Sequence, residues 1–400
     1  MAGRATCLGA HAVRPDRGVA VTRGIVVTIA GRTDVGQVRE HNEDAFLVAD
    51  LSADAPPTLG TVTPLGARGA LLMVADGMGG AAAGEVASAM ATSTVLEELR
   101  TRWVTSAADD ADHFAHALRE ATEQANQRIH AHAKTQPGMK GMGTTATLVG
   151  LLGPWAFLAQ VGDSRAYLVR GGVATQLTKD QSLMQRLIDA GELTEEEAER
   201  SERRNIILQA LGPEPRVRVD LTAQHLCRGD VLVLCSDGLS GQVRAGEIAE
   251  VIRETSDLDA ACAALIARAN AAGGPDNITV VAARVDGESL PVSAEGPPGH
   301  RPYVGEQAAR ATQRVDRTSL AAIAATPEIP ETRRDDAVAG EPPRPLDAPA
   351  PSGAAPDPEA RPKRRTSEML EAEDEALLSP RAAIALLVAG ALLVTAWLLA

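Results

Sequence analysis

Apolar residues recur along the first two thirds of the chain with two different periods. Longer stretches with an apolar residue every three or four positions predict amphipathic helices at 84–103, 112–133 and 245–273. Short apolar runs bounded by glycine, proline, aspartate or asparagine predict β-strands, which fall at 25–31, 45–50, 70–75, several times within 143–178, at 230–235 and at 277–285. One folded region therefore contains both kinds of element.

The order of these elements predicts the fold class. Within 143–178 the strands follow one another across Gly-Pro, Gly-Asp-Ser and Gly-Gly turns, which is typical of an antiparallel meander. The helices are grouped in pairs instead of following every strand. Grouped strands and paired helices predict an α+β fold with antiparallel sheets, not a doubly wound parallel sheet.

A change in composition after residue 286 predicts a domain boundary. Fifteen of the 24 prolines lie between 287 and 380, and such a segment cannot bury enough apolar surface to order itself. We therefore expect a folded domain at 26–286 and a Pro/Ala-rich disordered linker at 287–380. Residues 1–25 contain several arginines but no continuous apolar run, so we expect a disordered leader instead of a signal peptide.

The last 19 residues, 382–400, carry no charged side chain. As a helix they would span ~28 Å, close to the ~30 Å hydrocarbon core of a bilayer, so we expect a C-terminal transmembrane helix as a single-pass anchor. Basic residues at 361–365 and Arg381 precede it, and the positive-inside rule then places the folded domain in the cytoplasm, at the cell membrane. The alternative, a helix in the domain core, fits the uniform apolarity less well.

Charge and cysteine content exclude two broad classes. The formal net charge of -14 argues against a nucleic-acid partner, because such proteins present a basic surface. The chain has four cysteines without a paired Cys-x-x-Cys spacing, Cys7, Cys227, Cys235 and Cys262. We predict reduced, buried thiols and no disulfide framework.

Acidic residues beside glycine or asparagine are the candidate functional residues. They recur next to apolar runs, at Glu43 and Asp44, Asp76, Asp163, Asp237 and Asp276. A single Asp-Gly at a strand end is most often only a turn, and this interpretation stays open for each acid alone. The recurrence in one domain favours a metal site, and ligation by oxygen without His or Cys selects Mg²⁺ or Mn²⁺ over zinc.

Seven motifs occur in this order: RTDVGQVREHNEDA, VADGMGG, GTTATL, VGDSRAYLVR, LTKDQSL, LCSDGLSG and GGPDNITVV. Together they resemble the metal-dependent serine/threonine protein phosphatases of type 2C in their compact bacterial form. The resemblance covers about residues 30–285. It implies a sandwich of two antiparallel β-sheets flanked by pairs of α-helices (α-β-β-α), with a dinuclear metal site at one end.

The resemblance also implies a role for each acidic motif. Asp76 would bridge two Mn²⁺ or Mg²⁺ ions, with the carbonyl of Gly77 on one of them. Asp237 and Asp276 would complete the other. The implied reaction is direct attack of a metal-activated water on a phosphoserine or phosphothreonine, with Asp76 and Asp237 as essential acids.

Four further residues receive roles from the same resemblance. Glu43 and Asp44 would hold water around the ions, and Asp163 would hold a third ion. Arg39 would grip the substrate phosphate, for which the guanidinium fork is well suited.

Two positions depart from the family pattern. Met78 stands where eukaryotic members have a histidine that protonates the leaving alkoxide, and methionine cannot donate that proton. A metal-bound water is the first candidate for this role and His41 the second. Gln181 replaces a histidine that is common after the LTKD motif, and residues 188–207 are predicted to form a variable flap beside the site.

Three functional hypotheses remain at this point. The leading one is a phosphatase that acts on phosphorylated proteins and opposes bacterial Ser/Thr kinases, which would themselves be among its partners. The second is a catalytically inactive module of the same fold that binds phosphoproteins; the complete set of acids disfavours it. The third is a phosphatase with one dedicated client.

Overall fold

The computed structural model describes residues 24–201, 203–294 and 296–304. Three predicted segments lie wholly or largely outside these ranges, namely the leader at 1–25, most of the linker at 287–380 and the transmembrane helix at 382–400. No helix within the described ranges is long and apolar enough to cross a bilayer.

Two antiparallel sheets form the centre of the fold. The first has the strand order β10-β9-β12-β13-β1-β3 and the second β11-β8-β7-β4-β2, while β5 and β6 form a separate short ribbon. The bounds are β1 (Val26–Asp34), β2 (Ala45–Asp50), β3 (Val62–Pro64), β4 (Ala70–Ala75), β5 (Gly77–Met78), β6 (Gly143–Thr144), β7 (Ala146–Leu152), β8 (Trp155–Val161), β9 (Arg165–Arg170), β10 (Val173–Gln176), β11 (Asp220–His225), β12 (Val231–Cys235) and β13 (Ile278–Asp286).

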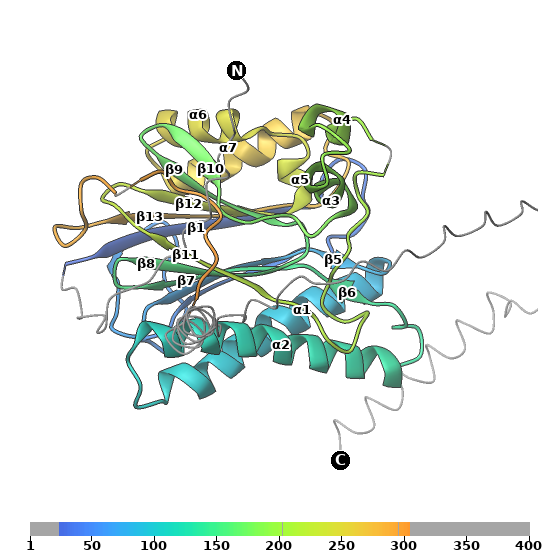
Figure 1. Cartoon of the computed structure of the whole chain (residues 1–400), viewed down its shortest axis with the longest axis horizontal. Helices are drawn as coiled ribbons and strands as arrows, with labels where there is room; N and C mark the ends of the chain where they lie inside the picture. The colour runs from blue at the N-terminus through green and yellow to red at the C-terminus, as the bar shows by residue number, and fades with distance from the viewer. Residues whose placement is uncertain (1–23, 202, 295, 305–400) are drawn as a thin grey trace, which may run out of the picture. The chain divides into compact units, whose positions relative to one another are not determined.

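Helix pairs cover the outer faces of both sheets, so the predicted α-β-β-α sandwich is confirmed (Figure 1). One pair covers the five-stranded sheet and the other the six-stranded sheet, while three short helices lie in loops. The bounds are α1 (Ala81–Leu99), followed by a π-helical turn (Arg100–Val104), α2 (Ala111–Thr135), α3 (Leu183–Asp189), α4 (Glu195–Glu199), α5 (Asp237–Ser240), α6 (Ala245–Glu254) and α7 (Leu258–Ala271).

Strand β4 shows why the central strands are apolar on both faces. Leu71 and Met73 pack in the core beneath α1 and α2, whereas Leu72 and Val74 pack in the core between the sheets. Every residue of β4 is buried. An apolar run that ends abruptly at Asp76 is therefore a strand whose two faces are both covered, and which reaches a polar environment only at its end.

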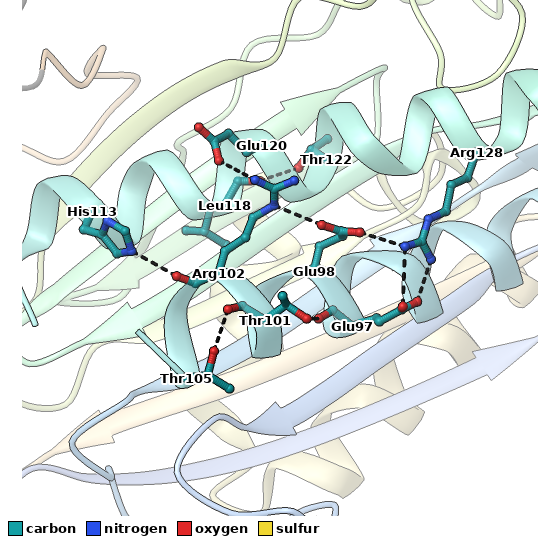
Figure 2. Close-up of polar contacts among 10 residues, drawn as sticks. All are labelled: Glu97, Glu98, Thr101, Arg102, Thr105, His113, Leu118, Glu120, Thr122 and Arg128. Atoms are coloured by element: carbon teal, nitrogen blue, oxygen red, sulfur yellow. Dashed lines mark hydrogen bonds and ion pairs between the residues drawn. The ribbon is translucent and has the colours of Figure 1, made fainter. Parts of the chain in front are cut away.

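Salt bridges join α1 to α2 on the outer side of the helix layer (Figure 2). Arg128 of α2 donates to Glu97 and Glu98, with closest distances of 2.5 and 2.7 Å. Arg102 donates to Glu98 at 2.9 Å and to Glu120 at 2.8 Å. Each carboxylate here has an arginine partner. Ion pairs this exposed add little to stability, so the alanine-rich core under the helices carries most of it.

Residues 296–304 continue the fold past the boundary predicted at 286. Tyr303 donates its amide to the Leu221 carbonyl at 2.8 Å, and the Ala223 amide donates to the Arg301 carbonyl at 3.1 Å. The Tyr303 side chain is 6% exposed and meets the Phe157 ring edge-on at 5.5 Å. Because a buried aromatic side chain contributes much apolar contact, this part of the predicted linker belongs to the folded domain.

Candidate functional site

Strand register brings the predicted acids to one end of the sandwich. Asp76 follows β4, and Glu43 and Asp44 precede β2; these strands are antiparallel, with Ala75 paired to Ala45. In the other sheet Asp237 follows β12 and Asp276 precedes β13, and Cys235 pairs with Val280. The end of one strand and the start of its antiparallel neighbour share an edge, so Asp76 comes near Asp44 in one sheet and Asp237 near Asp276 in the other.

Asp76 lies at the centre of this cluster. Burial raises its pKa well above the usual range, and the negative charges of Asp44, Asp237 and Asp163 raise it further. The pKa of Asp237 is also raised, by burial and then by Asp276. Such shifts require carboxyl groups that are both poorly hydrated and close together.

Asp44 and Asp163 are two further buried acids of the cluster, and the charge of each acts on Asp76. Burial is the main cause that raises the pKa of each to about 7. Asp163 is 7% exposed. In both residues the Oδ1 atom is buried and has no hydrogen-bond partner among the described residues. A buried carboxylate oxygen without a partner is unfavourable, and a cation or its bound water would supply the missing interaction.

The donor set fits an Mg²⁺ or Mn²⁺ ion that keeps several of its waters better than an ion ligated entirely by protein groups. Within the described ranges, no three His, Cys, Asp or Glu side chains converge closely enough to hold an ion by themselves. Mg²⁺ keeps several of its waters and is held by one or two carboxylates, so a convergent triad is not required. Acids that are close but not convergent, with orphaned oxygens, match that mode of binding.

Threonine and serine hydroxyls hold the Asp76 turn. The Asp76 amide donates to the Thr145 hydroxyl at 3.0 Å, and the Thr145 amide donates back to the Asp76 carbonyl at 2.8 Å. The Thr145 hydroxyl also contacts the Ser164 hydroxyl at 2.7 Å. Thr145 and Ser164 are fully buried. The backbone at Asp76 is thus tied to the turn that carries Asp163.

Two glycines allow three backbone segments to meet at Glu43. A Cβ atom at Gly77 would lie 2.3 Å from the Gly84 carbonyl and 2.5 Å from the Glu43 carbonyl. One at Gly84 would lie 1.8 Å from a Glu43 carboxylate oxygen. Any side chain at these positions would displace Glu43. Burial raises the pKa of Glu43, against the lowering effect of Arg39.

Arg39 lies at the edge of the acid cluster. Its guanidinium donates to Asp276 Oδ2 at 2.7 Å and is 53% exposed. That hydrogen bond is the main reason why the pKa of Arg39 is raised. Arg39 therefore presents a half-exposed cation beside the acids.

Asn277 is a site residue that sequence reasoning missed. Its Nδ2 donates to the carbonyls of Val35 and His41 at 3.0 and 2.9 Å, and its Oδ1 accepts from the Glu43 amide at 2.8 Å. It is 5% exposed. The side chain therefore holds both ends of the loop that carries Arg39. The available signal was a polar residue at the start of an otherwise apolar strand.

Ser236 is a second site residue that sequence reasoning missed. Its hydroxyl donates to Asp44 Oδ2 at 2.7 Å and accepts from the Thr279 amide at 3.0 Å. It is fully buried and directly precedes Asp237. The hydroxyl therefore fixes one oxygen of Asp44, while the other, Oδ1, has no hydrogen-bond partner among the described residues.

The two residues considered for proton donation differ in position. Met78 is half-buried in β5, next to Gly77. His41 is exposed, and its charge acts to lower the pKa of Glu43, although burial raises that pKa more. Neither position supplies a buried acid in direct contact with the cluster.

The sequence is similar to a known family model and to several named proteins. The family model described as Protein phosphatase 2C matches residues 64–273. The chain is 36% identical over 250 residues to the serine/threonine phosphatase stp of Listeria monocytogenes, covering 62% of this chain and 92% of the relative. It is 37% identical over 252 residues to the protein phosphatase PhpP of Streptococcus pneumoniae, covering 62% and 93%.

Solved structures give the same result. The crystal structure of the Mycobacterium tuberculosis serine/threonine phosphatase PstP/Ppp matches with a TM-score of 0.54 and 36% identity, covering 65% of this chain and 99% of that one. A second structure, the catalytic domain of PstP in complex with two manganese ions, matches with a TM-score of 0.53 and 36% identity, covering 66% and 99%.

Proposed function

The chain belongs to the protein phosphatase 2C family, and on that basis we propose that its acid cluster forms the metal centre of the enzyme. The relatives match over nearly their whole length, so the chain is a metal-dependent protein serine/threonine phosphatase that uses Mn²⁺ or Mg²⁺. One observation supports the assignment of residues. Buried carboxyl groups that repel one another lie together at one end of the sandwich, and two of their oxygen atoms have no hydrogen-bond partner among the described residues.

We assign the metal-binding groups as follows. Asp76, at the centre of the cluster, would lie between two ions, with the Gly77 carbonyl on one side and Asp237 and Asp276 on the other. Bound ions would activate a water and neutralise charge on the phosphoryl oxygens. The acids themselves orient the ions, and the Thr145 hydroxyl keeps the Asp76 turn in place.

Glu43, Asp44 and Asp163 would complete the surroundings. Ser236 fixes one oxygen of Asp44, and the second oxygen is then available to accept a hydrogen bond from water at the site. Glu43 is positioned by Asn277 through its amide. Asp163 is assigned to a third, more weakly held ion, as the family resemblance implies.

Arg39 would bind the phosphate of the substrate. Its guanidinium is half-exposed and already lies beside an acid of the centre, so a phosphoryl oxygen can reach it from solvent. Binding by Arg39 would hold the phosphorus with its Ser or Thr oxygen facing away from the attacking water. Because Met78 cannot donate a proton, we assign protonation of the leaving oxygen to water at the site.

The test of this function uses the full chain and a phosphothreonine peptide. We expect phosphate release in the presence of Mn²⁺ and its loss when a chelator is added. Turnover that continues without metal would contradict the assigned centre. A folded protein that binds the phosphopeptide without hydrolysing it would support the inactive-module hypothesis instead.

We further propose that the enzyme acts at the cell membrane on Ser/Thr kinases and their substrates. The support is the uncharged segment 382–400, which lies outside the described residues, and the basic residues at 361–365 that precede it. A membrane-tethered phosphatase would meet membrane-anchored kinases at a raised local concentration. The catalytic domain would then face the cytoplasm.

Cell fractionation tests the anchor. The full chain should require detergent for extraction, whereas a chain that ends after Val304 should not. The shortened chain ends there, and not at 286, because Tyr303 is buried. Equal solubility of both forms without detergent would contradict the membrane assignment.

A further inference from the structure

Gln181 lies between the turn that carries Asp163 and the predicted flap. Its side-chain Oε1 accepts from the Gly162 amide at 2.9 Å, and its backbone amide donates to the Gly162 carbonyl at 2.9 Å. Two hydrogen bonds thus join Gln181 to the residue that immediately precedes Asp163. One of the two depends on the side chain, so it can be removed by substitution.

The loop that contains the predicted flap is described at 183–201 and 203–207, is called the flap below, and begins and ends at the same place. The Leu208 amide donates to the Gln181 carbonyl at 2.8 Å, and Ser182 forms a β-bridge with Ile207. The Ser182 hydroxyl accepts from the Gln185 amide at 3.2 Å and so caps α3, the first helix of the flap. Any displacement of the flap base therefore reaches Gln181 directly.

Among the described residues, no side chain forms a hydrogen bond with the Asp163 carboxyl, and its Oδ1 has no partner although the residue is only 7% exposed. Its position depends on the backbone at Gly162, which has a φ of +105° and packs against Thr145. A Cβ atom at Gly162 would lie 2.7 Å from the Thr145 side chain, so the turn has little freedom on that side. On the other side, Gln181 holds it.

We propose that Gln181 is a positioning residue that couples the flap to the Asp163 carboxylate. Contacts that a protein substrate makes with the flap would then act on Asp163 through Gln181, whose side chain and backbone both bond to Gly162. The proposal rests on the assignment of Asp163 to the metal centre under the proposed function. It adds a connection between that acid and a surface segment outside the acid cluster.

The test compares Gln181→Met with Gln209→Met in the full chain. Gln209 is a matched control because its side chain contacts Arg218, accepting from the amide at 2.9 Å and donating to the carbonyl at 3.5 Å. The Gln181 side chain donates to the same carbonyl at 3.4 Å, so the bond to Gly162 is what distinguishes the two glutamines. For Gln181→Met we expect kcat on a phosphothreonine peptide to fall about 10-fold with KM changed less than about twofold. Gln209→Met should stay within about twofold of the wild type.

A double substitution separates positioning from general loosening. In the Asp163→Ala background, Gln181→Met should lower kcat by less than about twofold, because its effect acts through Asp163. An additive 10-fold loss in that background would overturn the proposal, and so would a kcat for Gln181→Met equal to that of the control.

Hydrogen exchange without metal or substrate gives a readout independent of activity. The Gly162 amide should exchange at least about 10-fold faster in Gln181→Met than in the control. Gln181→Glu keeps the accepting oxygen and should retain the protection. Unchanged exchange in Gln181→Met would overturn the coupling. If the wild type lacks Mn²⁺-dependent activity while exchange behaves as expected, the proposed function fails and the coupling does not.

Discussion

The α1–α2 layer and the acid cluster are both rich in charged groups but arranged in opposite ways. In the helix layer Glu97, Glu98 and Glu120 all have an arginine partner (Figure 2). In the acid cluster, Arg39 is the one arginine of the described ranges that bonds to any of the six acids, through Asp276. The carboxylates of the helix layer are paired with arginines of the same layer, whereas those of the acid cluster require bound cations to balance their charge.

Burial makes this difference significant. The helix-layer side chains are mostly in contact with water, which screens their charges. In the acid cluster burial is the largest cause of the raised pKa at Asp44, Asp76, Asp163 and Asp237. Unpaired carboxyl groups that persist in such surroundings indicate a ligand site, while paired ones on a surface indicate only a solvated helix pair.

The largest effect is expected from Asp76→Asn or Asp237→Asn. Each change removes one charge from the centre of the cluster and with it at least one ion. We expect phosphatase activity to fall at least about 1,000-fold, corresponding to ~4 kcal/mol of transition-state stabilisation. Hydrolysis of a phosphothreonine peptide at saturating Mn²⁺ measures this, and activity within 10-fold of the wild type would contradict the role of these acids.

Metal removal is expected to have the next largest effect, on stability. An ion present at 100 times its Kd should stabilise the fold by ~2.7 kcal/mol. With a chelator present, the melting temperature should also rise as the pH falls from 7.5 to 5.5. Asp44 and Asp163 have pKa values of about 7 in the folded protein, against ~3.9 when unfolded.

Proton binding explains why the melting temperature should rise as the pH falls. A carboxyl group with a raised pKa binds its proton more tightly in the folded chain, so the stability from protonation is present below about pH 4 and is lost as the pH rises through 7. Calorimetry with and without chelator measures both effects. A melting temperature that does not change when Mn²⁺ is added at pH 7.5 would show that the acids do not form a metal site.

A smaller effect is expected for Arg39→Ala. The guanidinium would bind the phosphate in the ground state, so KM should rise about 10-fold, or ~1.4 kcal/mol, with a smaller change in kcat. Steady-state kinetics on the phosphothreonine peptide measures the split. A lower kcat at unchanged KM would instead give Arg39 a role confined to the transition state.

The smallest effect is expected for Arg128→Ala in the helix layer. Its partner Glu97 is 63% exposed, and its partner Glu98, 13% exposed, keeps Arg102 as a second partner. The melting temperature should therefore change by no more than about 2 °C and phosphatase activity should stay the same. Added salt should reduce even this difference. A large loss of stability would mean that the surface ion pairs matter more than the apolar core beneath them.

Much of the fold follows from local patterns. The alternation of short apolar runs with turn residues gave the antiparallel sheets, and the apolar run that ends at Asp76 corresponds to a strand buried on both faces. The domain boundary predicted at 286 was too early. Tyr303 lies in a proline-rich stretch whose composition predicts disorder, but its side chain is buried against the domain. One buried ring can keep a segment on the fold when its composition alone predicts disorder.

The sequence by itself determined the kinds of group at the site: acids at the ends of apolar runs, glycines beside them and one arginine nearby. The tertiary structure decided which other side chains hold these groups, namely Asn277 under the Arg39 loop, Ser236 on Asp44 and Gln181 on the Asp163 turn. These contacts join segments up to 242 positions apart. Strand register sets which distant segments meet, and no local pattern encodes a hydrogen bond between them.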